Sequence, residues 1–205
     1  MRDPIEDDFI NAIMDGEIEE IKSLLEAHPD KLSIHDPLAV WTLGEHYKGS
    51  YPINIAASFN QAEVVKYLLE EGVMVDTVEV GETTLHLSTY AGSVEVATLL
   101  IEQGANLEAK DMDGNTPLCK AVEAGCIGTT KLLIDSGANT EVKLTINSHS
   151  YTIEEYANQC AENLGTDEAN ELAQLITTHK VELEKAKLDS VIANKEDKTT
   201  KRQKI

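Results

Sequence analysis

The sequence predicts an all-α repeat solenoid. The stretches that begin at Gly81 and Gly114 share identical residues 33 positions apart, among them the pairs Thr83 and Thr116, Leu85 and Leu118, and Gly92 and Gly125. Within both stretches, apolar residues recur at the three- and four-residue spacing of a helix that buries one face. Glycines recur where those helices are expected to end. Two helices per 33-residue unit, stacked unit upon unit, account for all three observations.

The residues at the helix starts identify the repeat type. The first copy contains "GETTLHLSTYAG" and the second "GNTPLCKAVEAG", variants of the motif T-P-L-H-x-A. Thr83 and Thr116 are placed to cap a helix start, and Pro117 fits its first turn. The period and the motif together resemble those of ankyrin repeats, each a β-turn followed by two antiparallel helices.

This resemblance implies helix pairs joined by β-hairpin loops, and protein binding without catalysis. It also implies that His86 forms a hydrogen bond across repeats. Cys119 occupies the same position in the next repeat, where we expect that bond to be missing.

Weaker copies extend the register in both directions. We expect repeats at about 5–36, 49–80, 81–113, 114–146 and 147–180, the first and last acting as caps, and an insertion at 37–48. Residues 1–180 would form one ankyrin-repeat domain. Residues 181–205 would prolong a long C-terminal helix to about Asn194 and end in a disordered charged tail.

Charge divides the chain into two parts. From Lys180 onward there are eight Lys and Arg against five Asp and Glu, whereas residues 1–179 hold nine against 32. An acidic solenoid disfavours nucleic-acid binding, which needs a basic surface. It favours a protein partner with a basic or amphipathic segment, although acidity alone also keeps a monomer soluble. The basic tail "KTTKRQK" is either a localisation or nucleic-acid signal or a solvated disordered end.

Cysteine usage and hydropathy indicate a cytoplasmic protein. The three cysteines are odd in number and lack metal-binding spacing, and "MRDPIEDDFI" is acidic where a signal peptide is basic and then apolar. No apolar run reaches the ~18 residues of a membrane span. We therefore expect a monomeric protein that does not contact a membrane.

The search for catalysis and cofactors gives no positive signal. "GCIGTTK" lacks the spacing of a phosphate-binding loop. His28, His35, Asp36 and His46 cluster near the insertion, but their spacing matches no zinc motif. We therefore expect neither a cofactor nor a metal, and no enzymatic activity.

The family resemblance implies binding by a concave surface built from hairpin tips and first helices. Carried onto this sequence, and with the two aromatic residues of the insertion, it gives these partner-binding residues: Trp41, Tyr47, Ile55, Phe59, Leu87, Tyr90, Met112, Asp113, Asn115, Lys120 and Glu123. Val80 and Glu82 join them at the edge of the tips. Large apolar residues inside an acidic rim are typical of an interaction hot spot.

Four other interpretations remain open. The insertion could fold back, so that Trp41 covers Phe59 and Tyr90 and closes the groove. The protein could be a scaffold that recruits a second protein, or itself, through its C-terminal helix. Ankyrin arrays also occur in host-directed bacterial effectors. An enzyme with a site in the insertion is the alternative from a different functional class.

Overall fold

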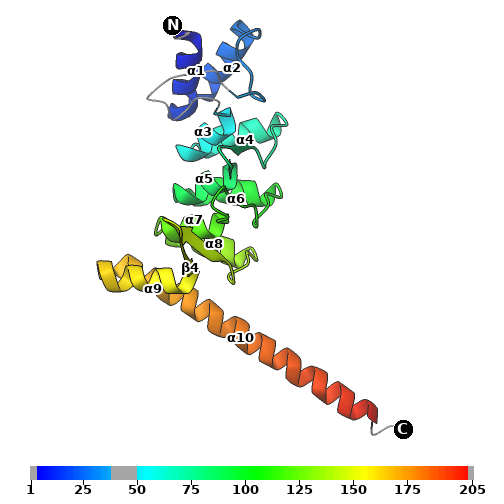
Figure 1. The fold of residues 1–205 in the computed structure, drawn as a ribbon. Coiled ribbons are helices and arrows are strands. Elements are labelled where there is room, and N and C mark those ends of the chain that lie inside the picture. Colours follow the sequence, from blue (N-terminus) through cyan, green and yellow to red (C-terminus); the bar gives the residue numbers. More distant parts are fainter. Residues whose placement is uncertain (1–3, 38–49, 203–205) are drawn as a thin grey trace. The chain divides into compact units, whose positions relative to one another are not determined.

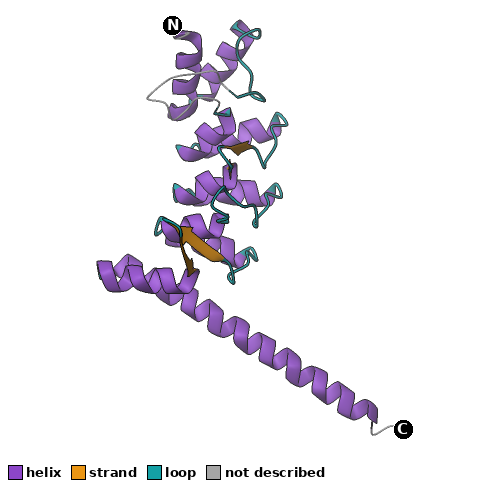
Figure 2. Cartoon of the chain, in the orientation of Figure 1, coloured by secondary structure: helices purple, strands orange, loops and turns teal. Residues whose placement is uncertain are grey.

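The computed structural model describes the backbone of residues 4–37 and 50–202, and side chains as far as Ser190. Helix pairs follow one another along the chain (Figures 1 and 2). They are α1 (Pro4–Asp15) with α2 (Ile18–Ala27), α3 (Pro52–Ser58) with α4 (Ala62–Glu70), α5 (Thr84–Tyr90) with α6 (Val94–Glu102), and α7 (Pro117–Glu123) with α8 (Ile127–Asp135). The sequence-based prediction of an all-α repeat solenoid is confirmed.

The core lies between successive pairs. First helices α1, α3, α5 and α7 contact one another in order, and second helices α2, α4, α6 and α8 do the same. Each pair places one or more branched aliphatic side chains in this core, fully buried: Ile13, Ile21, Ile53, Leu68, Leu85, Leu100, Leu118 and Leu133. Because every pair is buried by its neighbours, the solenoid depends on contacts between adjacent repeats rather than on one central core.

The helix starts and ends follow the local chemistry expected from the sequence. Thr83 precedes α5, and its hydroxyl accepts a hydrogen bond from the His86 backbone N–H. Thr116 does the same for α7 from the Cys119 N–H. Between the helices of each pair, Gly92 and Gly125 adopt φ values of 72° and 70°, a left-handed conformation that a residue without a Cβ adopts at little cost.

In the described residues, two β-hairpins follow helix pairs, one between α4 and α5 and the other after α8. Strand β1 (Val78–Glu79) pairs with β2 (Glu82–Thr83), and β3 (Lys143–Ile146) pairs with β4 (His149–Thr152), both antiparallel. The two residues between β1 and β2 are Val80, with φ 49°, and Gly81, with φ 84°. Positive φ at both positions is typical of the type I′ turn, whose twist matches the flanking strands.

The histidine expected to bridge repeats does so. His86 Nδ1 accepts a hydrogen bond from the Thr83 backbone N–H at 3.1 Å, and Nε2 lies 3.1 Å from the Asn115 carbonyl oxygen. A neutral ring protonated on Nε2 satisfies both bonds. At the same position of the next repeat, Cys119 places its Sγ 3.6 Å from the Lys143 carbonyl oxygen. A thiol is a weak donor, so this contact is a poor substitute for the histidine bond.

Residues 1–153 and 154–205 form two compact units. The second contains most of α9 (Ile153–Leu164) and all of α10 (Asp167–Arg202). Helix α10 continues beyond residue 180, as expected, but it also passes Asn194, where we expected the helix to stop. The segment contains no glycine or proline and is rich in Lys, Glu and Ala, which have high helix propensity.

A truncation in the central core tests the dependence of each repeat on its neighbours. Leu100→Ala in α6 should lower the free energy of unfolding by about 2–5 kcal/mol, because it leaves a cavity between adjacent helix pairs. Leu164→Ala, at an exposed position, should change it by less than about 0.5 kcal/mol. Urea denaturation followed by circular dichroism measures both. Equal effects would contradict the proposed core.

His86 should make stability depend on pH. Burial lowers the pKa of His86, although the Asn115 carbonyl bond opposes the shift. The unfolded chain takes up a proton near the ordinary pKa of about 6.5, and the folded protein resists it. The free energy of unfolding should therefore fall as the pH decreases from about 6.5 toward 5.

The matched variant is His86→Gln. It should be less stable than the wild type at pH 7 and lose less stability between pH 7 and 5.5. Denaturation midpoints of both proteins at the two pH values measure this difference. If the wild type and His86→Gln lose the same stability on acidification, His86 is not the cause of the pH dependence.

Candidate functional site

The structure separates the eleven residues predicted to contact a partner. Trp41 and Tyr47 lie in 38–49, outside the described residues. The remaining nine fall into three groups by exposure. Four side chains are exposed: Phe59, Tyr90, Met112 and Asp113. Three are half-buried, Leu87, Lys120 and Glu123, and two are buried, Ile55 and Asn115. The prediction therefore mixes surface residues with structural ones.

The expectation that Ile55 faces solvent is wrong. Its side chain is only 1% exposed. Helix α3 has seven residues, of which six are buried, because α1 and α5 contact it on either side and α4 also contacts it. A helix this enclosed has little free surface, and Ile55 contributes to the core.

Asn115 is also buried and joins two hairpin regions. Its side-chain amide donates to the Thr145 carbonyl oxygen at 3.0 Å, and its side-chain oxygen accepts from the Thr145 N–H at 2.7 Å. Its own backbone N–H donates to Asp111 at 2.8 Å, and its carbonyl faces His86. With these groups bonded inside the protein and only 2% of its surface exposed, Asn115 has a structural role, and its contact with a partner stays a prediction.

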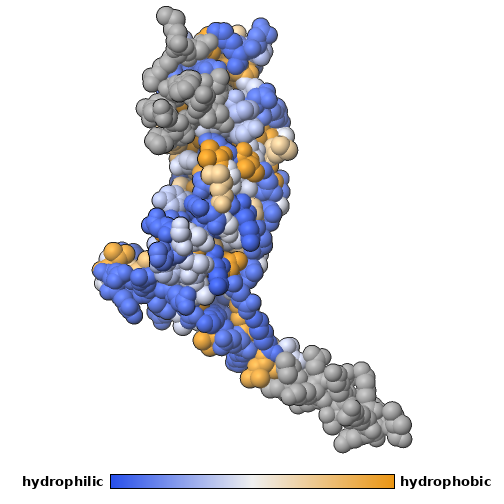
Figure 3. Space-filling model, viewed as in Figure 1, coloured by the Kyte–Doolittle hydropathy of each residue, from blue (hydrophilic) through white to orange (hydrophobic). Residues whose placement is uncertain are grey.

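Exposed apolar side chains lie at the hairpin tips and at the ends of two first helices. Val80 is 71% exposed and Met112 76%. The two tips touch, because a Cβ added to Gly81 would collide with Met112 Cγ. Tyr90 at the end of α5 is 54% exposed and Phe59 at the end of α3 is 37% exposed. Figure 3 shows apolar surface over the second and third helix pairs, with hydrophilic surface around it.

Lys120 holds together an acidic cluster beside these residues. Its ammonium lies 2.9 Å from Glu82, 3.3 Å from Asp111 and 3.8 Å from Glu123. It also lies 5.7 Å from the centre of the Tyr90 ring. Burial opposes the charge on Lys120, but the hydrogen bond to Glu82 and the three carboxylates outweigh it, so the pKa of Lys120 is raised well above its usual range. The positive charge of Lys120 is neutralised by carboxylates of the protein itself, and the cluster of one lysine and three carboxylates keeps a net negative charge.

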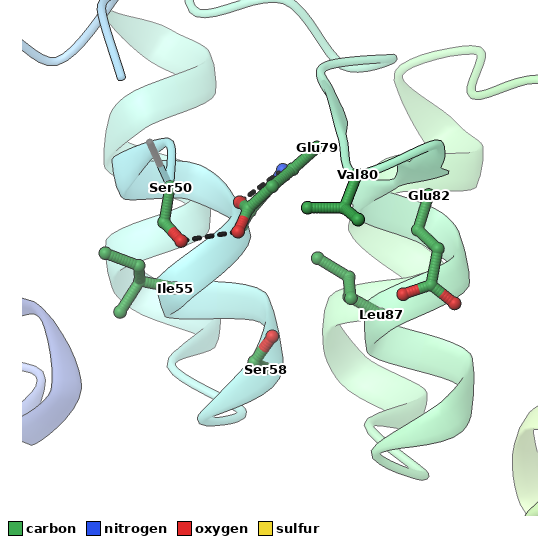
Figure 4. A pocket seen from close by; sticks show the side chains of 8 residues that line it. Ser50, Ile55, Ser58, Glu79, Val80, Glu82 and Leu87 are labelled. Atoms are coloured by element: carbon green, nitrogen blue, oxygen red, sulfur yellow. Dashed lines mark hydrogen bonds between the residues drawn. The ribbon is translucent and has the colours of Figure 1, made fainter. Parts of the chain in front are cut away.

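A hollow of about 250 Å³ opens between the β1–β2 hairpin and the first helices of the second and third pairs. We call it the Glu79 hollow, and its lining consists of Ser50, Asn54, Ile55, Ser58, Glu79, Val80, Glu82 and Leu87. Val80 projects from the hairpin and Leu87 from α5 toward the same space, opposite Glu79 (Figure 4). The hollow thus has an apolar wall formed by Val80 and Leu87, and the carboxylates of Glu79 and Glu82 also line it.

Hydrogen bonds hold Glu79 in place. Its carboxylate accepts from the Ser50 hydroxyl and, at 3.2 Å, from the Asn54 amide. Asn54 in turn accepts from the Thr84 hydroxyl at 2.7 Å. Sequence reasoning missed Ser50, Asn54 and Glu79. The register did contain a signal, because Asn54 occupies the position of His86 in the preceding repeat and likewise bonds to the next one.

Comparison with known proteins agrees with the fold. A family model of ankyrin repeats (3 copies) matches residues 9–111 and 75–144. The chain belongs to the ankyrin-repeat family. Ankyrin repeats are general protein–protein interaction modules, typically without enzymatic activity, and they imply a protein partner.

The relatives share only part of this ankyrin-repeat chain. Mouse Ankyrin repeat and SOCS box protein 11 is 38% identical over 71 residues, which are 35% of this chain and 22% of that protein. Serine/threonine-protein kinase 12 of Arabidopsis thaliana is 28% identical over 98 residues, 46% of this chain and 21% of the kinase. Drosophila melanogaster E3 ubiquitin-protein ligase Ufd4 is 36% identical over 75 residues, 37% of this chain and 3% of the ligase. The similarity covers the repeats and a small fraction of each relative.

Two further findings concern metals and membranes. Within residues 4–37 and the described part from Ser50 onward, no three or more His, Cys, Asp and Glu side chains are grouped to hold a metal ion. His46, one of the residues considered for a metal, lies outside that range. No helix in the described part of the chain combines the length and apolar character needed to cross a membrane.

The structural role of Asn115 can be measured. Asn115→Ala should lower the free energy of unfolding by about 1–3 kcal/mol, because it leaves the N–H and carbonyl of Thr145 without their partner. Asp113→Ala, two residues away and exposed, is the control and should change stability by less than about 0.5 kcal/mol. If thermal denaturation shows Asn115→Ala to be as stable as Asp113→Ala, the hydrogen bonds assigned to Asn115 contribute nothing.

Proposed function

We propose that this protein is a non-enzymatic adaptor or inhibitor that binds a partner protein on the surface made by its hairpin tips and first helices. The observation that carries the proposal is the group of exposed apolar side chains there. Val80, Met112, Tyr90 and Phe59 come from two hairpin regions and two helices and remain exposed in an otherwise acidic, polar surface. Aromatic and methionine side chains are enriched where proteins bind one another.

Charge defines the partner more closely. Four carboxylates lie near these apolar residues. Lys120 pairs with those of Glu82, Asp111 and Glu123, and Glu79 adds a fourth beside the hairpin. A partner with a basic or amphipathic segment would bury apolar side chains and meet the excess negative charge. Opposite charges on the two proteins also increase the rate of association.

The test is capture of partner proteins from cell lysate with three forms of the full chain. Tyr90→Ala combined with Met112→Ala should reduce the amount of a specific partner at least about tenfold, as expected for loss of about 1.4 kcal/mol or more of binding energy. The bound proteins are quantified by mass spectrometry, and circular dichroism verifies the fold of each variant.

Met74→Ala is the control for this experiment. Met74 is 75% exposed, almost the same as Met112, but it lies in the loop after α4 rather than at a hairpin tip. It should capture the same partners as the wild type. Equal capture by all three forms would contradict binding at the tips.

One observation favours a second binding surface. On α10, Val181 and Leu188 are both exposed. They are seven residues apart, which places them on the same side of a helix. A chain that recruits a second protein through α10 would act as a scaffold. Val181→Ala combined with Leu188→Ala should then remove a different set of captured proteins from that lost with Tyr90→Ala and Met112→Ala.

A further inference from the structure

We propose that the Glu79 hollow binds a short linear segment of the partner in which an aliphatic side chain stands next to an arginine or lysine. This inference rests on the proposed function and assigns the chemistry that the partner presents. The evidence comes from the size of the hollow, its charge and the conformation of Val80.

The size of the hollow fits side chains rather than a small-molecule ligand. Its volume of about 250 Å³ is below the roughly 300–1,000 Å³ of typical ligand pockets. Val80 and Leu87 form an apolar wall on the hairpin and α5 sides. An aliphatic side chain inserted there would remove exposed apolar surface of Val80 from water, which is favourable in proportion to the area buried.

The charge of the hollow selects a cation. Of the eight described residues that line it, Glu79 and Glu82 are acidic and none is Lys or Arg. Glu82 already pairs with Lys120, whereas the bonds to Glu79 come from the neutral side chains of Ser50 and Asn54. The negative charge of Glu79 is thus fixed in position without a neighbouring cation in these contacts. A guanidinium or ammonium group beside the aliphatic side chain would complement it.

Val80 occupies a turn position whose backbone conformation is unfavourable for valine. Its φ is 49°, in the left-handed region, which is a genuine outlier for a β-branched side chain. Asn-Gly is among the preferred sequences for this two-residue turn, and here the pair is Val-Gly. An unfavourable residue that is also apolar, 71% exposed and beside a hollow is explained by contact with a partner. Strained residues of this kind cluster at binding sites.

Val80→Asn therefore separates stability from binding. Asparagine tolerates the left-handed conformation, so the variant should relieve backbone strain and unfold at a temperature about 2–4 °C higher than the wild type. The same change removes the apolar wall and should weaken binding at least about tenfold. A variant that becomes more stable while it loses affinity cannot owe the loss to misfolding.

The probe is a phage-displayed library of random 12-residue peptides, selected on the full chain. Enriched peptides should share an aliphatic residue adjacent to Arg or Lys. Synthetic copies should bind wild type and Met74→Ala equally, bind Val80→Asn at least about tenfold more weakly, and lose affinity as salt is raised. Glu79→Gln should bind equally well to peptides with the basic residue and to copies with glutamine in its place.

Each other result overturns the inference. The inference fails if the enriched peptides lack a basic residue, or if they bind Val80→Asn as well as the wild type. It also fails if no peptide is enriched, which includes the case in which the protein's own insertion fills the hollow. If partner capture still depends on Tyr90 and Met112, the proposed function stands and only the assignment of the hollow fails. If it does not, the proposed function fails as well.

Discussion

The hydrogen bonds that join successive hairpin regions and first helices are the constraint on which this structure depends. Three polar side chains, each near the start of a first helix or in the hairpin region before it, bond to the next first helix or hairpin region along the chain. Asn54 reaches Thr84, His86 reaches the carbonyl of Asn115, and Asn115 reaches both backbone groups of Thr145. The bonds of His86 and Asn115 satisfy backbone groups of the next hairpin region, and the bond between Asn54 and Thr84 joins two side chains. They also fix the spacing of the tips, which carry the exposed apolar residues.

The packing between repeats also explains how a largely polar surface can carry apolar residues that are free to contact a partner. Burial between helix pairs uses the aliphatic side chains, so the apolar residues left at the tips are not needed for the fold. Lys120 bridges Glu82 and Asp111 from adjacent hairpin regions and holds the acidic cluster in a defined position beside Tyr90. A partner would meet a rigid arrangement of apolar and acidic groups, which reduces the entropy lost on binding.

The fold could be predicted from the sequence because it repeats. The same residue recurs 33 positions later at the same place in the repeat, as in Gly92 and Gly125 or Thr83 and Thr116. Each recurrence supports the same local structure in both repeats, and each has a local physical reason. Individual surface residues could not be predicted in this way. Ile55 occupies a nominally outward position but is buried because α3 is enclosed by its neighbours, and Asn115 faces inward because Thr145 takes both ends of its amide. The positive φ of Val80 runs against the residue preference of its turn, and the partners of Glu79 lie 25 and 29 positions away. The end of α10 depends on weak propensities alone.

Hydrogen–deuterium exchange of the whole chain, free and bound to a captured partner, tests the central claim most directly. The account predicts slower exchange in the bound protein over residues 78–90 and 111–116, where the hairpin tips and α5 lie, and little change in α10. Slower exchange confined to residues 154–202 would contradict it and would place recognition on the C-terminal helices instead.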